Sequence, residues 1–159
     1  MKEIIIVPED RINVIKNEKT KSLIEEKLKV HMTIRENDVE IDGEGLELYN
    51  AKNIIKAIGR GFSPERAFRL LDENELLEII NLEFSESKNR TIRARLIGTH
   101  GKTRYIMERD SGASISIYGN TVAIIGTYEQ IQIAKKSIEM IIRGSKHSLV
   151  YRYLAENKL

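Results

Sequence analysis

The stretch Arg-Leu-Ile-Gly-Thr-His-Gly-Lys-Thr-Arg, residues 95–104, contains the loop that decides the fold, Gly98-Thr99-His100-Gly101. A Gly-x-x-Gly loop lets another polymer approach the main chain closely, because glycine has no side chain and accepts backbone angles that other residues avoid. The four-residue pattern alone is unspecific, so the prediction depends on its surroundings. Basic, amphipathic stretches flank the loop on both sides, over 88–97 and 102–109.

Both flanking stretches are predicted to be helices. Ile92 and Leu96 lie one helical turn apart and give the first stretch an apolar face, while Arg90 and Arg93 fall on another face. The second stretch ends at a Ser-Gly pair, residues 111–112, which is a typical helix stop. The loop is therefore expected at a helix N-terminus, where free N–H groups and the helix dipole favour a phosphate.

The rest of the second half follows a strand and helix pattern. A strand is expected over 78–84, and a hairpin over 113–118 and 121–125 with a tight turn at Gly119-Asn120. A long helix is expected from about residue 128 to 143. The order is strand, helix, helix, strand, strand, helix, so the predicted fold class is α+β.

The first half of the chain repeats this pattern 83 positions earlier. Strand positions, a closing glycine and a helix face coincide in the pairs Met32/Ile115, Ile34/Ile117, Val39/Val122, Ile41/Ile124, Gly43/Gly126, Ala51/Ala134 and Ile55/Ile138. Such internal similarity indicates a duplicated unit. Near the place of the glycine loop the first copy has Lys-Asn-Glu-Lys, residues 16–19, without glycine. We therefore predict two domains, 1–75 and 76–159, of which only the second keeps the loop.

The two halves differ in charge. Residues 1–75 carry 13 Lys and Arg against 16 Asp and Glu, whereas residues 76–159 carry 13 against 8. A basic excess beside the glycine loop is expected of a surface that binds phosphates. The acidic first half is better suited to a protein surface or to solvent.

Composition limits the class of protein. The chain has no cysteine, which excludes disulfides and thiolate metal sites, and no cofactor is expected. No apolar run reaches the length of a membrane span, and the first residues lack a signal-peptide pattern. A soluble, cytoplasmic protein is expected.

Two further segments allow alternatives. Residues 58–71 are interpreted as a short helix that bridges the two copies; the alternative is that Arg60, Arg66 and Arg69 extend a nucleic-acid track. The tail, residues 144–154, is interpreted as a last helix that packs on the second copy. For the tail the alternative is contact with RNA through Lys146, His147 and Arg152.

These motifs resemble the KH domains, whose type I members have the element order given above. Three further stretches sharpen the resemblance: Gly-Arg-Gly-Phe-Ser-Pro-Glu-Arg-Ala at 59–67, Ser-Ile-Tyr-Gly-Asn-Thr-Val-Ala-Ile-Ile-Gly at 116–126, and the tail at 147–151. They are similar to the archaeal counterparts of partner of Nob, an assembly factor of the small ribosomal subunit. The resemblance covers nearly the whole chain.

The resemblance implies two tandem type I KH domains, of which the first has a degenerate glycine loop. It also implies binding of single-stranded RNA near the 3′ end of precursor 16S rRNA, in small-subunit rRNA processing. The implied protein partners are the Nob-type endonuclease that trims this end and the alpha subunit of the initiation factor.

The predicted RNA interface combines the loop, nearby cations and an apolar floor. Its residues are Arg90, Arg93, Arg95, Ile97, Gly98, Thr99, His100, Gly101, Lys102, Arg104, Ile115 and Ile117. The cations would bind phosphates, and these contacts would fix the register of the RNA on the protein. The bases would rest on the three isoleucines, and their edges would meet the strand over 115–117. For Arg95 the alternative is a surface pair with a carboxylate; for His100 it is a solvent-exposed position.

Catalysis is not expected. A P-loop, Gly-x-x-x-x-Gly-Lys-[Ser/Thr], would need glycine where Leu96 stands. A metal nuclease needs clustered carboxylates or histidines, and here they are scattered. Two alternatives to rRNA processing stay open, namely a KH protein of mRNA or RNA decay, and a protein-interaction scaffold.

Overall fold

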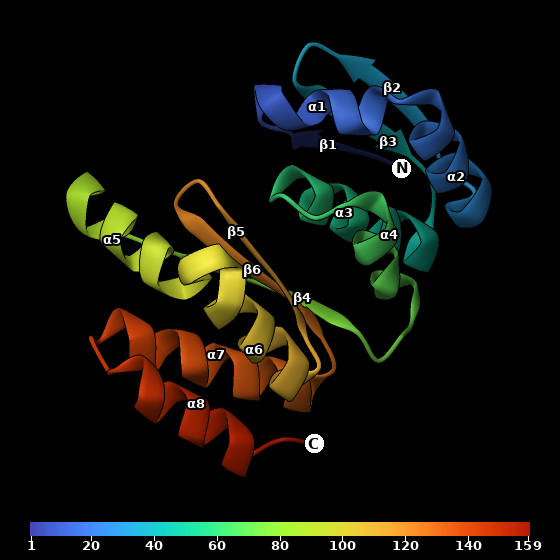
Figure 1. The fold of residues 1–159 in the computed structure, drawn as a ribbon. Coiled ribbons are helices and arrows are strands. Elements are labelled where there is room, and N and C mark those ends of the chain that lie inside the picture. Colours follow the sequence, from blue (N-terminus) through green and yellow to red (C-terminus); the bar gives the residue numbers. More distant parts are fainter. The chain divides into compact units, whose positions relative to one another are not determined.

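The computed structural model describes residues 1–159 and divides the chain into two compact units, Met1–Leu71 and Asp72–Leu159. Each unit contains one three-stranded antiparallel sheet and its own set of helices (Figure 1). Every helix falls short of the length and apolar character that a membrane crossing requires.

Unit 1 has its central strand between two edge strands, in the order β1-β3-β2. Its strands are β1 (Lys2–Ile6), β2 (His31–Arg35) and β3 (Asp38–Asp42). Its helices are α1 (Glu9–Lys16), α2 (Glu18–Leu28), α3 (Gly45–Gly59) and the short α4 (Pro64–Ala67), which a 3-10 turn (Phe68–Leu71) follows.

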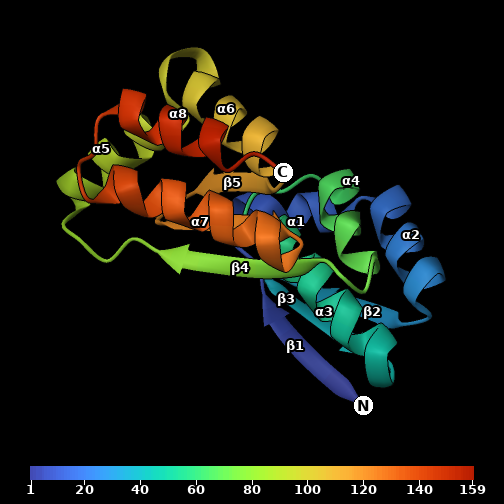
Figure 2. The same cartoon turned by 90° about the horizontal axis from the view of Figure 1, so that it is seen from below.

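Unit 2 repeats this topology with the strand order β4-β6-β5. Its strands are β4 (Leu76–Asn81), β5 (Ser114–Tyr118) and β6 (Thr121–Gly126). Its helices are α5 (Glu86–Ile97), α6 (Lys102–Ser111), α7 (Tyr128–Ile142) and α8 (His147–Glu156), with a 3-10 turn (Thr99–Gly101) between α5 and α6. Figure 2 shows α7 running along this sheet beside β4.

The predicted element order of the second half is therefore present, and helices combine with a small sheet as predicted. The strand β4 begins two residues and ends three residues earlier than the predicted range 78–84. Leu82 leaves the sheet and is buried, and Ser85 then caps α5 by accepting a hydrogen bond from the Lys88 N–H at 3.1 Å. The run of apolar residues predicted the strand, but the start of the next helix determines where it ends.

The core of unit 2 lies between the sheet and the helices. All six residues of β6 are buried, as expected of a central strand covered by helices. The helix α7 begins with a capping box, in which Thr127 and Gln130 exchange hydrogen bonds at 2.9 and 3.3 Å. Val150 and Leu154 of α8 are completely buried, so the tail packs on unit 2, as the sequence analysis favoured.

Corresponding glutamates cap the sheet edge in both units. The Glu25 carboxylate accepts the Met32 N–H at 2.9 Å, and the Glu108 carboxylate accepts the Ile115 N–H at 2.8 Å. Both the donors and the acceptors are 83 positions apart. The similarity therefore extends from the order of elements to individual side-chain contacts.

Corresponding arginines anchor the first helix of each unit. Arg11 donates to the carbonyl oxygens of Ile58 and Phe62, and Arg95 donates to those of Ile141 and Ser145. The acceptor pairs are again 83 positions apart, whereas the two arginines are 84 apart. Each acceptor pair lies where the long helix of its unit ends and the next short segment begins. Each arginine thus joins the first helix of its unit to that connection.

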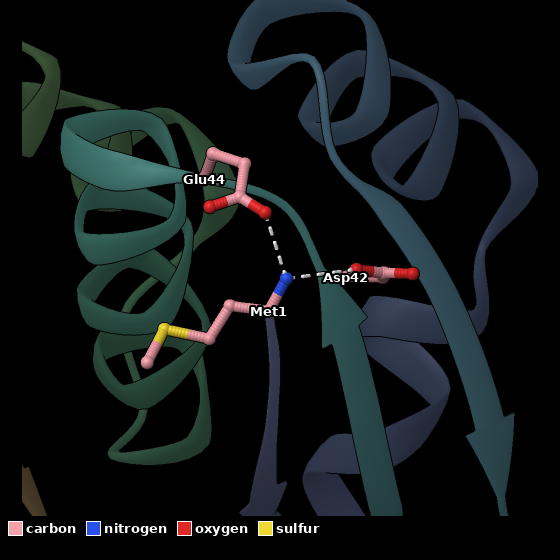
Figure 3. A network of polar contacts seen from close by, with 3 residues as sticks. All are labelled: Met1, Asp42 and Glu44. Carbon is pink, nitrogen blue, oxygen red and sulfur yellow. Dashed lines mark hydrogen bonds and ion pairs between the residues drawn. The ribbon is translucent and has the colours of Figure 1, made fainter.

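The N-terminal amino group closes one end of the sheet in unit 1 (Figure 3). It donates to the carboxylates of Glu44 at 2.9 Å and Asp42 at 3.5 Å, and the Met1 carbonyl accepts the Gly43 N–H at 3.0 Å. The Glu44 carboxylate, with Asp42 beside it, raises the pKa of the Met1 amino group. The amino group and both carboxylates are exposed to solvent, so these two ion pairs contribute little to stability.

Candidate nucleic-acid interface

The glycine loop of unit 2 has left-handed backbone angles at three of its four residues. Gly98 has φ +76°, His100 has φ +55° and Gly101 has φ +75°. Left-handed angles cost little for glycine but are uncommon for other residues. Because Gly98 ends α5 and Gly101 precedes α6, the chain reverses between two helices within one short 3-10 turn.

The two glycines have different surroundings. A Cβ atom on Gly98 would lie 2.3 Å from the Thr103 Oγ1 and 2.8 Å from the Thr103 backbone nitrogen, whereas one on Gly101 would have nothing within 4 Å. Gly98 therefore allows α5 and α6 to approach each other closely. Only Gly101 leaves open space of the kind that a sugar-phosphate backbone needs, so the expected openness of the loop applies to one glycine and not to both.

The helix α6 starts without a side-chain cap. Gly101 precedes it, and no side chain accepts hydrogen bonds from its first N–H groups. In unit 1, by contrast, the Asn17 side chain caps α2 and accepts from the N–H groups of Lys19 at 3.1 Å and Thr20 at 3.4 Å. A side chain therefore already occupies the N-terminal donors of α2 in unit 1. In unit 2 no side chain does so, and the N–H groups of Gly101 and Lys102 bond to the carbonyl oxygens of Gly98 and Thr99 within the turn.

The predicted cations near the loop differ in how strongly the chain already engages them. The side chains of Arg90 and Lys102 are exposed and make no hydrogen bond or ion pair within the chain. Arg104 lies 3.7 Å from Glu108, and the Arg93 guanidinium donates to the Asn120 side chain at 2.6 Å. Arg90 and Lys102 are accordingly the cations that can reach a phosphate without first giving up a contact.

Arg95 is held by main-chain carbonyls rather than by a carboxylate. In addition to its two bonds to the connection between α7 and α8, its own carbonyl oxygen accepts a hydrogen bond from the His147 ring at 2.9 Å. The alternative of a surface pair with a carboxylate is therefore wrong for Arg95. Its charge still lies near the loop, but its side chain positions α5 against the C-terminal helix.

The three predicted floor residues lie at different depths. Ile97 is 39% exposed beside the loop, and Ile117 is partly buried against the core. Ile115 is completely buried, so its side chain belongs to the core and the predicted contact of that side chain with a base is not supported. The strand β5 nevertheless has one unpaired edge, because it pairs only with β6.

Glu108 already occupies part of that edge. Its carboxylate accepts the N–H of Ile115, and strand alternation directs the N–H of Ile117 toward the same side. A base that meets the edge of β5 would therefore pair with the backbone of Ile117 rather than that of Ile115. Glu108 could not be found from the surrounding sequence, since a single glutamate in a basic helix carries no local signal.

The helix α8 supports the loop from behind. Thr103, against which Gly98 packs, is buried, and its hydroxyl group lies 2.9 Å from the Tyr151 hydroxyl of α8. Neither Thr103 nor Tyr151 was predicted from the sequence as part of the site. The loop is thus held by a chain of contacts from Gly98 through Thr103 to Tyr151.

An acidic side chain of α6 is neutralised locally. Asp110 is buried, and Arg109 donates to it at 2.8 Å while Lys158 lies 3.7 Å away. The hydrogen bond from Arg109 holds the pKa of Asp110 below its usual value. No group of three or more His, Asp or Glu side chains is arranged to hold a metal ion. Asp110 is therefore paired with cations of its own unit and adds no open negative charge near the loop.

Comparison with known proteins points to one family. A model of the second KH domain of PNO1, described as a eukaryotic-type KH domain (KH domain type I), matches residues 74–158. A KH domain-containing protein of Methanocaldococcus jannaschii is 40% identical to this chain, over 98% of the chain and 74% of that protein. The pre-rRNA-processing protein PNO1 of Chaetomium thermophilum is 28% identical, over 94% of the chain but only 63% of its own length.

A solved structure is similar over nearly the whole chain. It is the Dim2p of Pyrococcus horikoshii in a complex with a/eIF2alpha and rRNA, with 49% sequence identity and a TM-score of 0.91. The similarity covers 98% of this chain and 93% of that chain. It therefore includes both units and not only the one that the family model matches.

Proposed function

Since this chain belongs to the PNO1 family of KH-domain proteins, we propose that it binds single-stranded RNA in the maturation of the small ribosomal subunit, near the 3′ end of precursor 16S rRNA. The family relatives carry the name of pre-rRNA-processing proteins, and the similar Dim2p was solved with rRNA. The observation that supports the site most strongly is the uncapped start of α6 beside the unobstructed Gly101.

We further propose that the two units are tandem type I KH domains, over 1–75 and 76–159. The equivalent glutamates Glu25 and Glu108, and the equivalent arginines Arg11 and Arg95, support a common origin. The Asn17 cap supports a first domain without an RNA clamp. In this proposal unit 1 offers a surface for a protein, which agrees with its excess of acidic residues.

The proposed mode of binding separates phosphates from bases. One phosphate lies at the start of α6, next to Gly101, where no side chain caps the helix and the helix dipole favours an anion. Arg90 and Lys102 bind neighbouring phosphates. Arg93 and Arg104 reach the RNA strand after they release Asn120 and Glu108, respectively. The bases rest on Ile97 and Ile117 and meet the edge of β5. Thr99 and His100 border the strand.

The proposed role is to hold and present RNA and not to cleave it. KH modules grip about four nucleotides of single strand through a loop of this kind. A protein partner would then act on the held strand. We propose the alpha subunit of the initiation factor as one partner, because the similar Dim2p was solved with a/eIF2alpha. The Nob-type endonuclease, which the family resemblance implies, is the other.

The binding of the purified chain to single-stranded RNA tests this function. We expect a 3′-end segment of precursor 16S rRNA to bind more tightly than an unrelated strand of equal length. Affinity should fall as salt rises, with a log–log slope of about −0.7 for each phosphate contacted. With about four nucleotides in the clamp, the total slope is expected near −2 to −3.

Two results would contradict the proposal. Affinity that is independent of salt would favour a protein scaffold, because a scaffold does not displace counterions from RNA. Equal affinity for the rRNA segment and for mRNA-like strands of the same length would favour a role in mRNA binding or RNA decay.

A further inference from the structure

A hollow lies on the α8 side of the glycine loop. It has a volume of about 430 Å³ and lies between α5 and the start of α8. Its polar lining comes from Arg90, Thr91, Arg95, Thr99 and His147. Gly98 also lines it, so the hollow begins at the loop itself.

We propose that this hollow is a second anion site, which binds a phosphate of the same RNA strand after the strand leaves the clamp. The proposal rests on the RNA-binding function proposed above and extends the site by one contact. The lining includes two guanidinium groups, two threonine hydroxyls and an imidazole, and it includes no carboxylate. A lining of this kind favours an anion over a cation or an apolar group.

A base is a less suitable occupant than a phosphate. Ala94 is the only apolar side chain among the lining residues, and His147 is the only aromatic one. The His147 ring already stacks on Tyr151, with ring centroids 6.0 Å apart and an angle of 29° between the planes. Single-stranded bases are usually held by stacking on aromatic side chains, and the hollow does not offer that contact.

The hollow is formed before any ligand binds. Arg95 is fixed by the carbonyls of Ile141 and Ser145, and the His147 ring is fixed because its Nε2–H donates to the Arg95 carbonyl. A charged group that is already immobile loses little conformational entropy on binding. The equivalent arginine of unit 1, Arg11, makes the same kind of bonds, but the helix that follows its own helix, α2, is capped by the Asn17 side chain.

The position of the hollow makes it an extension of the clamp. Thr99 lies in the glycine loop and Gly98 ends α5, and both line the hollow. A strand that crosses the loop can therefore present its next phosphates to α5 and α8. The C-terminal helix would then contribute to RNA binding as well as to the stability of unit 2.

The length dependence of RNA binding tests this site. We propose to compare oligonucleotides of about four and about ten nucleotides, both rich in the same bases, on the whole chain. Thr91→Asp places a carboxylate in the hollow at an exposed helix position whose hydroxyl bonds only within α5, to the Ser87 carbonyl. Thr91→Asn is the neutral control of the same size.

We expect Thr91→Asp to weaken binding of the longer strand by about 10-fold and to leave the short strand unchanged. The salt slope for the longer strand should become shallower by about 0.7, the value of one phosphate contact. The Thr91→Asn control should bind both strands as the native chain does. His147→Gln, with a thermal melt to check folding, should reproduce part of the loss for the longer strand.

Equal losses for both strands would overturn the second site, because the substitution would then act on the clamp itself. An unchanged affinity for the longer strand would overturn it as well. If the native chain binds neither strand, the proposed RNA-binding function fails first, and this outcome is distinguishable from the other two.

Discussion

The double substitution Thr99→Asp and His100→Asp is expected to weaken the binding of single-stranded RNA by at least about 100-fold while unit 2 stays folded. Both side chains are exposed in the loop, so neither change disturbs the core. The new carboxylates would stand where a phosphate is proposed to lie, and like charges at close range repel strongly outside bulk water.

The fold should tolerate these two changes for a specific reason. His100 has φ +55°, and aspartate is among the few residues that accept this region. A carboxylate near the start of α6 also interacts favourably with the helix dipole. Loss of binding would therefore report repulsion of RNA and not unfolding, which a thermal melt of each variant checks.

The matched control is Thr99→Asn with His100→Asn, which keeps the shape of the double variant without its charge. It should lose no more than about 3-fold in affinity, because the main-chain N–H groups and Lys102 remain. A second control replaces Asn17 and Glu18 of unit 1, which should hardly change RNA affinity. If the aspartate variant bound RNA as the native chain does, the clamp would be assigned to the wrong loop.

Substitution by alanine is expected to cost more stability at Gly98 than at Gly101. Gly98→Ala should lower the free energy of unfolding by about 3 kcal/mol, from overpacking against the Thr103 backbone plus the cost of a left-handed alanine. Gly101→Ala should cost only about 1 kcal/mol, because its Cβ would meet no other atom.

RNA binding should show the reverse order. Alanine at Gly101 fills the open space beside the start of α6, so we expect a loss of affinity of about 10-fold or more in a protein that is still folded. Urea unfolding gives the stabilities, and affinities are compared in the absence of urea, where both variants are mostly folded. Equal stability losses at the two positions would contradict the described difference between the glycines.

The order of elements and the clamp could be predicted because both depend on local sequence. Apolar periodicity and a glycine-bounded loop indicate helices and their junction without knowledge of the tertiary structure. The depth of a residue does not follow in the same way. Ile115 and Ile117 lie on the same face of β5, yet only Ile115 is completely buried. Periodicity identifies the face, whereas the helices packed above it determine the depth.

The role of Arg95 could not be predicted, because its partners lie about fifty residues further along the chain. A basic residue in a basic helix resembles any phosphate contact until the connection between α7 and α8 is placed beside it. The Tyr151 contact to Thr103 is of the same kind. Long-range contacts of polar groups leave no periodic pattern in the sequence.

The offset of 83 residues between the two copies relates polar positions as well as apolar ones. Glu25 and Glu108 lie at the same offset as the matched isoleucines and glycines. A comparison of polar positions at that offset would have identified the pair before the structure did. Its meaning, the capping of the free edge of β2 and β5, required the strand order.

A titration followed by NMR tests the central claim most directly. The chain, labelled with nitrogen-15, is titrated with a single-stranded segment from the 3′ end of precursor 16S rRNA, and each amide signal is followed. The largest shifts are predicted at Thr99, His100, Lys102 and Ile117, with little change around Asn17 in unit 1. Saturable binding that shifts the signals of unit 1 and leaves residues 99–102 unmoved would contradict the clamp of unit 2.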